Sequence, residues 1–207
     1  MRLPAIRTLA LLGAAVVLAA CARDAAPPEG RDAKASTAPA VAPEPDRDQH
    51  SYAEPDRVRI EDIDLDLTVD FDQKRLAGTA TYELDWRDPT ATTLVLDTRD
   101  LTIESVEAET GDDQWTALEY TLEDADPLLG SKLVIQVPGR EDEVRIAYHT
   151  SPEASGLQWL TPAMTQGGET PFMFSQSQQI HARSWVPLQD TPRVRFTYSA
   201  HVTSPED

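Results

Sequence analysis

Residues 63–71 read IDLDLTVDF, and this alternation of apolar and polar side chains decides the fold class. Successive side chains of a β-strand point to opposite faces, so the segment predicts a half-buried strand with an acidic outer face. After a polar turn at residues 73–75, a second alternating run predicts the antiparallel partner strand of a hairpin. The side chains expected to point inward from this second strand are Leu76, Ala80, Tyr82, Leu84 and Trp86.

Further short strands are expected beyond this hairpin, separated by turn signals such as Asp-Pro, Pro-Gly and Ser-Pro. The segments are residues 93–97, 101–108, 114–120, 132–137, 143–148, 171–176 and 193–203. No window from Val58 onward sustains a helical period for ten residues. Many short strands of this kind are typical of an all-β fold, either a sandwich or a saddle-shaped pair of sheets.

The first 20 residues have the features of an export signal, because two arginines precede an uncharged run at residues 8–20. That run is too short to cross a hydrocarbon core of about 30 Å as a helix. The LAAC sequence of residues 18–21 is similar to a bacterial lipobox, in which the chain is cut before the cysteine and the cysteine is acylated. We therefore expect residues 1–20 to be a lipoprotein signal peptide with a signal helix, and Cys21 to be lipidated. An ordinary signal peptide with a chance cysteine is the alternative.

Residues 22–50 contain five prolines and no aromatic residue. Such a segment buries too little apolar surface to offset the entropy lost on ordering. We expect residues 21–55 to be the lipidated cysteine and a disordered linker, followed by a β domain at residues 56–207. Several acyl chains together anchor a protein stably. Ala22 stands where an aspartate would favour the inner membrane, so the expected location is the bacterial cell envelope, lipid-anchored at the outer membrane and facing the periplasm.

The formal net charge is −18 at pH 7, from 36 acidic and 18 basic side chains. So acidic a chain repels phosphate backbones, which excludes nucleic acid as a partner, and it offers no polybasic patch to anionic lipids. Solubility is the simplest explanation of the charge. The single cysteine, Cys21, excludes a disulfide within the chain.

The familiar catalytic motifs are missing from the sequence. There is no His-Glu-x-x-His, and the four histidines are far apart at His50, His149, His181 and His201. The aspartates of residues 62–66 imitate the start of a calcium loop, but Leu67 and Gln73 stand where that loop needs glycine and glutamate. A nucleophile elbow, a phosphate-binding glycine loop and a dinucleotide fingerprint are also missing. The sequence therefore predicts no metal site and no catalytic residue in this chain.

Three blocks resemble the amino-terminal domain of the M1 zinc aminopeptidases, most closely the branch that contains leukotriene A4 hydrolase. They are LVLDTRDLTIE at residues 94–104, TSPEASGLQWLTP at 150–162, and FSQSQQIHAR at 174–183, which runs on into QDTP at 189–192. The resemblance covers about residues 50–207, in the order of the family. It implies a saddle-shaped antiparallel β-sandwich that covers a catalytic domain, whose zinc ligands come later in the chain.

The resemblance to this family also implies a function for the complete protein. The complete protein would be an envelope zinc metallo-aminopeptidase that hydrolyses amino-terminal residues from peptides. This chain would be a fragment or truncation that supplies the wall of the substrate pocket and a scaffold, binds no zinc itself, and is inactive alone. Its expected partners are peptide substrates, its own missing catalytic domain, and the membrane through the lipid anchor. The alternative is a free-standing envelope lipoprotein with a binding or structural role and no enzymatic activity.

Two residues take a role from the resemblance. The family's Gln-x-Gln element falls on Gln176 and Gln178, where it lines the pocket for the first side chain and approaches the substrate amine. An amide oxygen can accept a hydrogen bond from an ammonium group, which suits glutamine to that place. The alternative is that both are polar residues of an edge strand. Four other matching residues are expected to belong to the scaffold or core, namely His181, Arg183, Trp159 and Trp185.

Overall fold

The computed structural model describes residues 47–111 and 114–205. The expected signal peptide of residues 1–20, Cys21 and most of the expected linker of residues 21–55 lie outside the described residues. The end of that linker is described, and it differs from the expectation of disorder because Ser51 and Pro55 are buried against the β domain. None of the helices in the described part of the chain has the length and hydropathy needed to cross a membrane.

Eleven strands and two short 3₁₀ helices make up the regular structure of the described residues. The strands are β1 (Val58–Asp70), β2 (Arg75–Trp86), β3 (Thr93–Thr98), β4 (Thr102–Gly111), β5 (Gln114–Ala117), β6 (Tyr120–Leu122), β7 (Ser131–Gln136), β8 (Glu143–His149), β9 (Leu157–Leu160), β10 (Phe172–Ser175) and β11 (Thr197–Thr203). The 3₁₀ helices are η1 (Pro162–Met164) and η2 (Ala182–Ser184).

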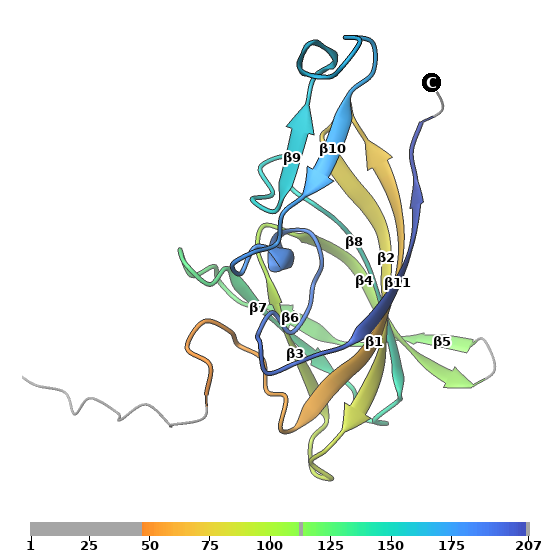
Figure 1. The fold of residues 1–207 in the computed structure, drawn as a ribbon. Coiled ribbons are helices and arrows are strands. Elements are labelled where there is room, and N and C mark those ends of the chain that lie inside the picture. Colours follow the sequence, from red (N-terminus) through yellow and green to blue (C-terminus); the bar gives the residue numbers. More distant parts are fainter. Residues whose placement is uncertain (1–46, 112–113, 206–207) are drawn as a thin grey trace, which may run out of the picture. The chain divides into compact units, whose positions relative to one another are not determined.

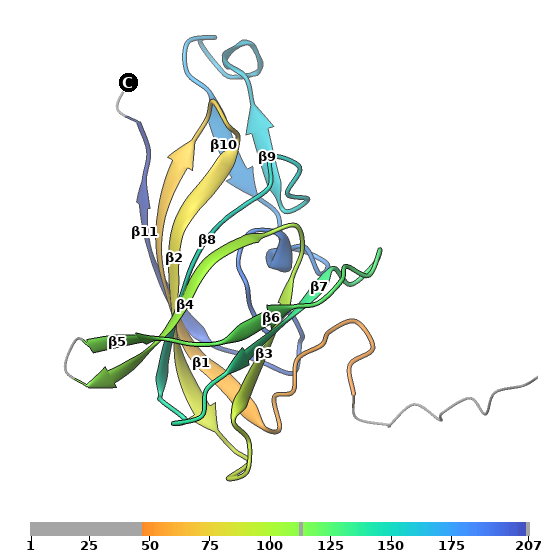
Figure 2. The ribbon, with the colours of Figure 1, turned by 180° about the vertical axis from the view of Figure 1, so that it is seen from behind.

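These strands form three sheets, which Figures 1 and 2 show from opposite sides. The large sheet has six strands in the order β11-β1-β2-β8-β4-β5. A three-stranded sheet has the order β3-β7-β6, and β9 pairs with β10 in a separate two-stranded sheet. The prediction of an all-β fold built mainly from antiparallel strands is confirmed.

One hydrophobic core joins the large sheet to the three-stranded sheet. Ile63, Leu65 and Leu67 of β1 are at most 4% exposed, whereas the aspartates between them point to the outer face. Across the core, Leu94 of β3 and Ile135 of β7 are 0% exposed. The five side chains predicted to point inward from β2 are buried or, for Trp86, partly buried. The alternation in the sequence therefore identified the core face of the hairpin correctly.

The predicted strand of residues 193–203 differs most from the structure. Only β11 is regular there, and it runs parallel to β1 at the edge of the large sheet. Tyr198 and Val202, two apolar residues of this alternating segment, are 70% and 53% exposed. Their face is apolar, yet no described element covers it.

The predicted strand of residues 114–120 is divided into β5 and β6, which belong to different sheets. The change occurs at two adjacent residues. Leu118 N–H donates to the Val106 carbonyl of the large sheet, and the Glu119 carbonyl accepts from Gln136 of the three-stranded sheet. A polar alternation cannot reveal such a change of sheet, because both halves keep the same period.

Candidate functional site

Both predicted glutamines lie in one loop, residues 176–181 between β10 and η2, which we name the glutamine loop. Its first residue, Gln176, follows β10 directly, and its backbone N–H donates to the Gly156 carbonyl at 2.8 Å. The peptide bond between Gln178 and Gln179 is cis. Both predicted glutamines lie beyond the last residue of β10, outside the residues assigned to a strand.

The side chains of the two glutamines have different surroundings. Oε1 of Gln176 accepts a hydrogen bond from the Gln178 backbone N–H at 3.1 Å, within the loop itself. Gln178 lines a groove with a volume of about 890 Å³, and Gln176 is not among the residues that line it. The structure thus brings the predicted pair into one loop but places only Gln178 at the groove.

The groove is mostly apolar, and among the described residues no lysine or arginine lines it. Its apolar wall consists of Leu128, Ile180, Ala182, Leu188, Pro192, Val194 and Phe196. Two carboxylates, Asp48 and Asp190, line it together with the glutamine loop. Such a composition suits an apolar ligand that carries a positive charge, because the carboxylates favour a cation and the apolar wall favours a hydrocarbon body.

Asp48 gives the groove a fixed negative charge. Burial acts to raise the pKa of Asp48, but hydrogen bonds from Thr191 and from the His50 backbone outweigh burial and hold that pKa below its ordinary value. Oγ1 of Thr191 donates to Oδ2 of Asp48 at 2.6 Å, and the His50 N–H donates to Oδ1 at 2.9 Å. Hydrogen bonds of this kind stabilise the ionised form, so Asp48 stays charged at neutral pH.

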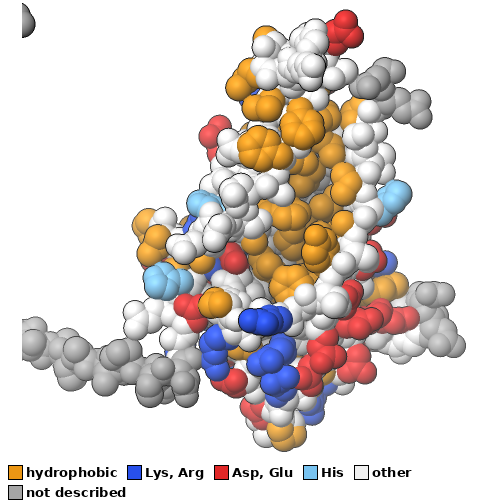
Figure 3. Space-filling model, in the orientation of Figure 1, with side chains coloured by type: hydrophobic (Ala, Val, Ile, Leu, Met, Phe, Trp, Pro, Cys, Tyr) orange, Lys and Arg blue, Asp and Glu red, His pale blue; other side chains and the backbone are white. Residues whose placement is uncertain are grey.

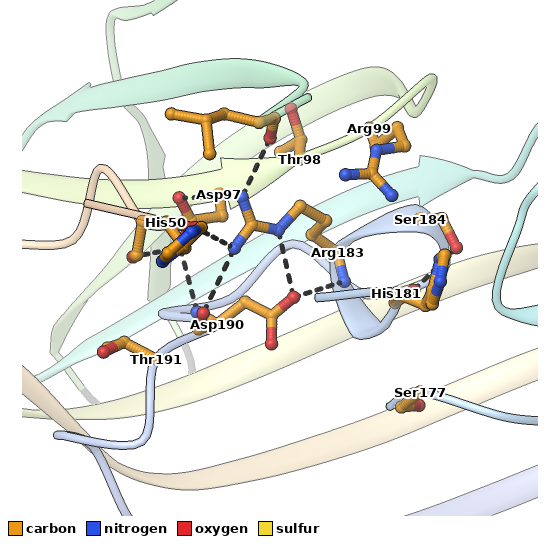
Figure 4. Close-up of polar contacts among 12 residues, drawn as sticks. His50, Asp97, Thr98, Arg99, Ser177, His181, Arg183, Ser184, Asp190 and Thr191 are labelled. Carbon is orange, nitrogen blue, oxygen red and sulfur yellow. Dashed lines mark hydrogen bonds and ion pairs between the residues drawn. The ribbon is translucent and has the colours of Figure 1, made fainter. Parts of the chain in front are cut away.

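Behind the groove lies a buried ion cluster centred on Arg183 (Figure 4). The Arg183 side chain is 0% exposed, and its Nε donates to Oδ2 of Asp190 at 3.0 Å. Nη1 donates to the Leu129 carbonyl at 2.8 Å, and Nη2 donates to the His50 carbonyl at 2.8 Å. Asp97 is also 0% exposed and lies 3.6 Å from Nη1. Arg183 therefore occupies a scaffold position, as the sequence analysis expected.

Asp97 ties the segment before β1 into this cluster. Its carboxylate accepts from the Ser51 hydroxyl at 2.6 Å and from the Tyr52 backbone N–H at 2.7 Å. The Asp190 backbone N–H donates to the same carboxylate at 2.9 Å. Burial raises the pKa of Asp97, and the Arg183 guanidinium and these three donors oppose the rise. The segment that carries Asp48 and His50 is thereby fixed as one wall of the groove.

The remaining matched residues also have structural contacts. Nδ1 of His181 lies 2.8 Å from the Ser155 hydroxyl, and Nε1 of Trp185 donates to the Ser177 hydroxyl at 3.1 Å. Trp159 packs edge-on against Phe71, with ring centroids 5.8 Å apart. Within the described residues no group of three or more His, Cys, Asp or Glu side chains could hold a metal ion. The described residues therefore do not fit a zinc site.

Sequence reasoning missed the ion cluster and the wall formed by Asp48 and His50. A signal for the cluster was present, because three of the matched segments each contain one member. LVLDTRDLTIE contains Asp97, FSQSQQIHAR ends at Arg183, and QDTP contains Asp190. Their meeting in the structure explains why Arg183 and Asp97 are charged residues at fully buried positions.

A family model described as the Peptidase M1 N-terminal domain matches residues 54–207. The chain belongs to this family. Among curated relatives of this M1 amino-terminal domain, Leucine aminopeptidase 2 of Pyricularia oryzae is 39% identical over 143 residues, which cover 66% of this chain and 22% of the relative. Leukotriene A-4 hydrolase of Xenopus laevis is 39% identical over 144 residues, which cover 67% of this chain and 23% of that protein.

Solved structures agree with this family assignment. Yeast LTA4 hydrolase in complex with bestatin matches with a TM-score of 0.71 and 32% identity, over 78% of this chain and 25% of that chain. An M1 zinc metallopeptidase from Deinococcus radiodurans has a TM-score of 0.53 at 20% identity, which supports the fold alone. The matched region of the M1 domain described here thus covers between 22% and 33% of the length of these relatives.

Proposed function

We propose that this chain is the substrate-pocket and scaffold domain of a zinc metallo-aminopeptidase in the bacterial cell envelope, which removes amino-terminal residues from peptides. Family membership supports the reaction class, since relatives matched over the same domain are aminopeptidases by name. The envelope location rests on the LAAC sequence that ends at Cys21. The chain's own contribution would be to hold a substrate's amino terminus and to support the domain that carries the zinc.

The observation that carries the proposal is the place of Gln178 on a mostly apolar groove that is also lined by the carboxylates of Asp48 and Asp190 and, within the described part of the chain, by no lysine or arginine. A peptide's amino terminus is an ammonium group on a Cα atom, and the side chain on the same Cα atom is often apolar. The Gln178 amide oxygen can accept from the ammonium, and ionised Asp48 adds a favourable potential. The apolar wall would then receive the first side chain.

A second observation supports a scaffold role. Phe172 and Phe174 of β10 are 54% and 44% exposed, and Tyr198 of β11 is 70% exposed. Figure 3 shows hydrophobic side chains gathered on this side of the molecule, between β10 and β11. We call Phe172, Phe174, Tyr198 and Val202 the open face. Contiguous apolar patches of this kind usually mark a contact surface, and a zinc-binding catalytic domain of the same protein is the occupant we propose.

The chemistry of peptide hydrolysis is not assigned to any residue of this chain. No described group fits a zinc ion, so zinc and its ligands would have to come from that catalytic domain. The role of these residues is limited to binding and orienting a substrate.

The test is to purify the protein with whatever its gene encodes after this domain and to assay hydrolysis of aminoacyl reporters. Zinc-dependent hydrolysis that falls when Gln178 is replaced by alanine would support the proposal. A protein that is folded and zinc-loaded but does not hydrolyse any aminoacyl reporter would contradict it and favour a free-standing binding lipoprotein. Mass spectrometry tests the location separately, because an acylated Cys21 and release of Cys21→Ala from membranes are expected.

A further inference from the structure

The buried hydroxyl of Ser184 connects the last residue of the glutamine loop, His181, to Gly156, and Gly156 also binds the first residue of the loop, Gln176. Ser184, the last residue of η2, is 0% exposed. Its Oγ accepts from the Gly156 backbone N–H at 2.8 Å and donates to the His181 carbonyl at 2.7 Å. The Gly156 carbonyl in turn accepts from the Gln176 N–H at 2.8 Å. Gly156 and Ser184 therefore hold both ends of the loop at one point.

The contact is close because residue 156 has no side chain. A Cβ atom built on Gly156 would lie 2.6 Å from the His181 carbonyl oxygen and 2.9 Å from Oγ of Ser184. Both distances are shorter than real contacts to a Cβ atom. The end of the loop thus rests directly on the Gly156 backbone, an approach that glycine allows.

A neighbouring contact fixes the middle of the loop. Nε1 of Trp185, the residue after Ser184, donates to the Ser177 hydroxyl at 3.1 Å, and the Ser177 carbonyl accepts from the His181 N–H at 3.0 Å. Figure 4 shows His181 beside Ser184, with Ser177 nearby. Ser177 precedes Gln178 and His181 follows it, so hydrogen bonds hold the backbone on both sides of Gln178.

We propose that Ser184 is a positioning residue that sets the place of Gln178 in the groove. Ser184 is not among the residues that line the groove, so it acts through Gly156 and His181 and not by touching a ligand. A hydroxyl can donate once and accept at the same time, which is what this position requires. The importance of Gln178 for a substrate rests on the function proposed above, whereas the order of the loop does not.

The first test is amide hydrogen exchange in the chain itself. We compare Ser184→Ala with Thr150→Val, a matched control in which a buried hydroxyl that accepts from the Leu76 backbone N–H is removed. Ser184→Ala is expected to speed exchange of residues 176–181 by about tenfold or more, because local opening exposes those amides, while β2 and β8 change by less than about twofold. Unchanged exchange in the loop would overturn the proposal. So would loss of cooperative folding, because Ser184 would then support the whole domain.

The second test uses a protein that carries this domain together with a zinc-binding catalytic domain. Ser184→Ala is expected to raise KM by about threefold to tenfold, and the double variant with Gln178→Ala should be no worse than Gln178→Ala alone. If the fold-changes of the two single variants multiplied in the double variant, Ser184 would act independently of Gln178, and the proposal would be overturned. If Gln178→Ala alone had no effect, the proposed function would fail, and the exchange experiment would still decide the role of Ser184.

Discussion

The Arg183 cluster and the open face belong to the same domain, but the cluster is buried and hydrogen-bonded, whereas the open face is exposed. Arg183 is 0% exposed and its guanidinium donates to Asp190 and to the carbonyls of Leu129 and His50. Tyr198 is 70% exposed, and its apolar neighbours on the open face are covered by no described element. A buried charge tolerates no missing partner, whereas an apolar surface can remain exposed at a moderate cost. The difference indicates that the cluster serves the domain itself and the open face serves a partner.

The largest effect on stability is expected from disrupting the buried Arg183 cluster. Arg183→Met leaves the Asp97 and Asp190 carboxylates without the cation between them, and it removes the guanidinium donor from the carbonyls of Leu129, His50 and Asp190. Removal of one partner from a buried ion pair costs about 3–5 kcal/mol, which is a large fraction of the stability of a small domain. Urea denaturation should measure that loss in free energy of unfolding.

Arg87→Met is the matched control for this prediction. Arg87 pairs with Asp85 at 2.7 Å, but the two side chains are 41% and 34% exposed. An exposed pair contributes about 0–1 kcal/mol. Equal losses for Arg183→Met and Arg87→Met would show that the buried cluster has no special role in stability.

The next largest effect is expected on catalysis, from replacing Gln178, which lines the groove. In a catalytically active protein that contains this domain, Gln178→Ala should lower kcat/KM by about 10- to 150-fold. That range corresponds to a hydrogen bond to a charged group, worth about 1.5–3 kcal/mol. The melting temperature should barely change because the side chain is exposed. An unchanged kcat/KM, or an unfolded domain, would contradict the assignment.

Two further substitutions sharpen the assignment of Gln178. Gln178→Glu should keep activity, because a carboxylate also accepts from an ammonium group and does so more strongly. Gln176→Ala should have a smaller effect than Gln178→Ala, since Oε1 of Gln176 accepts from the Gln178 backbone and does not line the groove. Steady-state kinetics with one aminoacyl reporter can rank all three variants. A Gln176→Ala defect larger than that of Gln178→Ala would reverse the roles assigned to the two residues.

A smaller effect on stability is expected from the open face. Tyr198→Ser and Phe172→Ser should each change the free energy of unfolding of the chain by less than about 0.5 kcal/mol, because neither side chain is buried. Both should reduce self-association of the chain in sedimentation velocity. Leu122→Ser is the control, since Leu122 is 41% exposed on β6, outside the open face. A loss of stability typical of a core residue would show that the open face is part of the domain's own core.

Much of the fold could be predicted from the sequence, because the signals are local. The alternation of β1 and β2 fixes which side chains are buried, and Leu65 and Tyr82 are buried as predicted. Tyr198 stands in a similar alternation but is 70% exposed, because alternation identifies an apolar face and does not say what covers it. The parallel pairing of β11 with β1 depends on contacts between residues more than 130 positions apart, such as Ile63 with Tyr198, and no local pattern specifies them.

The site was predictable only in part. The resemblance placed Gln176 and Gln178 together, and the structure puts both in the glutamine loop. The resemblance could not distinguish the roles of Gln176 and Gln178, because those roles depend on one hydrogen bond and on which of the two side chains lines the groove. Asp48 was assigned to the expected linker by composition, yet contacts with Thr191 and the nearby ion cluster make that segment a wall of the groove.

A similarly small effect is expected on the outer face of the large sheet, which is exposed like the open face but charged. Glu143 of β8 lies opposite Glu83 of β2 in the sheet. Burial, followed by the neighbouring Glu109 and Glu83, raises the pKa of Glu143 above its ordinary value of 4.5. A carboxyl whose pKa is raised by folding binds its proton more tightly in the native state. Its protonated form therefore favours folding below pH 4.5, and this contribution is lost as the pH rises through the raised pKa.

Glu143→Gln should accordingly raise the melting temperature at pH 7 by a small amount, of the order expected for a surface substitution of about 0.5 kcal/mol. The gain should vanish near pH 4, where the native Glu143 is itself protonated. Glu153→Gln, in an exposed loop, changes the net charge by the same amount and controls for general repulsion in this acidic chain. Thermal melts of both variants across pH 4–8 check the prediction. An equal gain for Glu153→Gln would assign the effect to net charge, and a lower melting temperature for Glu143→Gln at pH 7 would show that Glu143 forms a favourable contact.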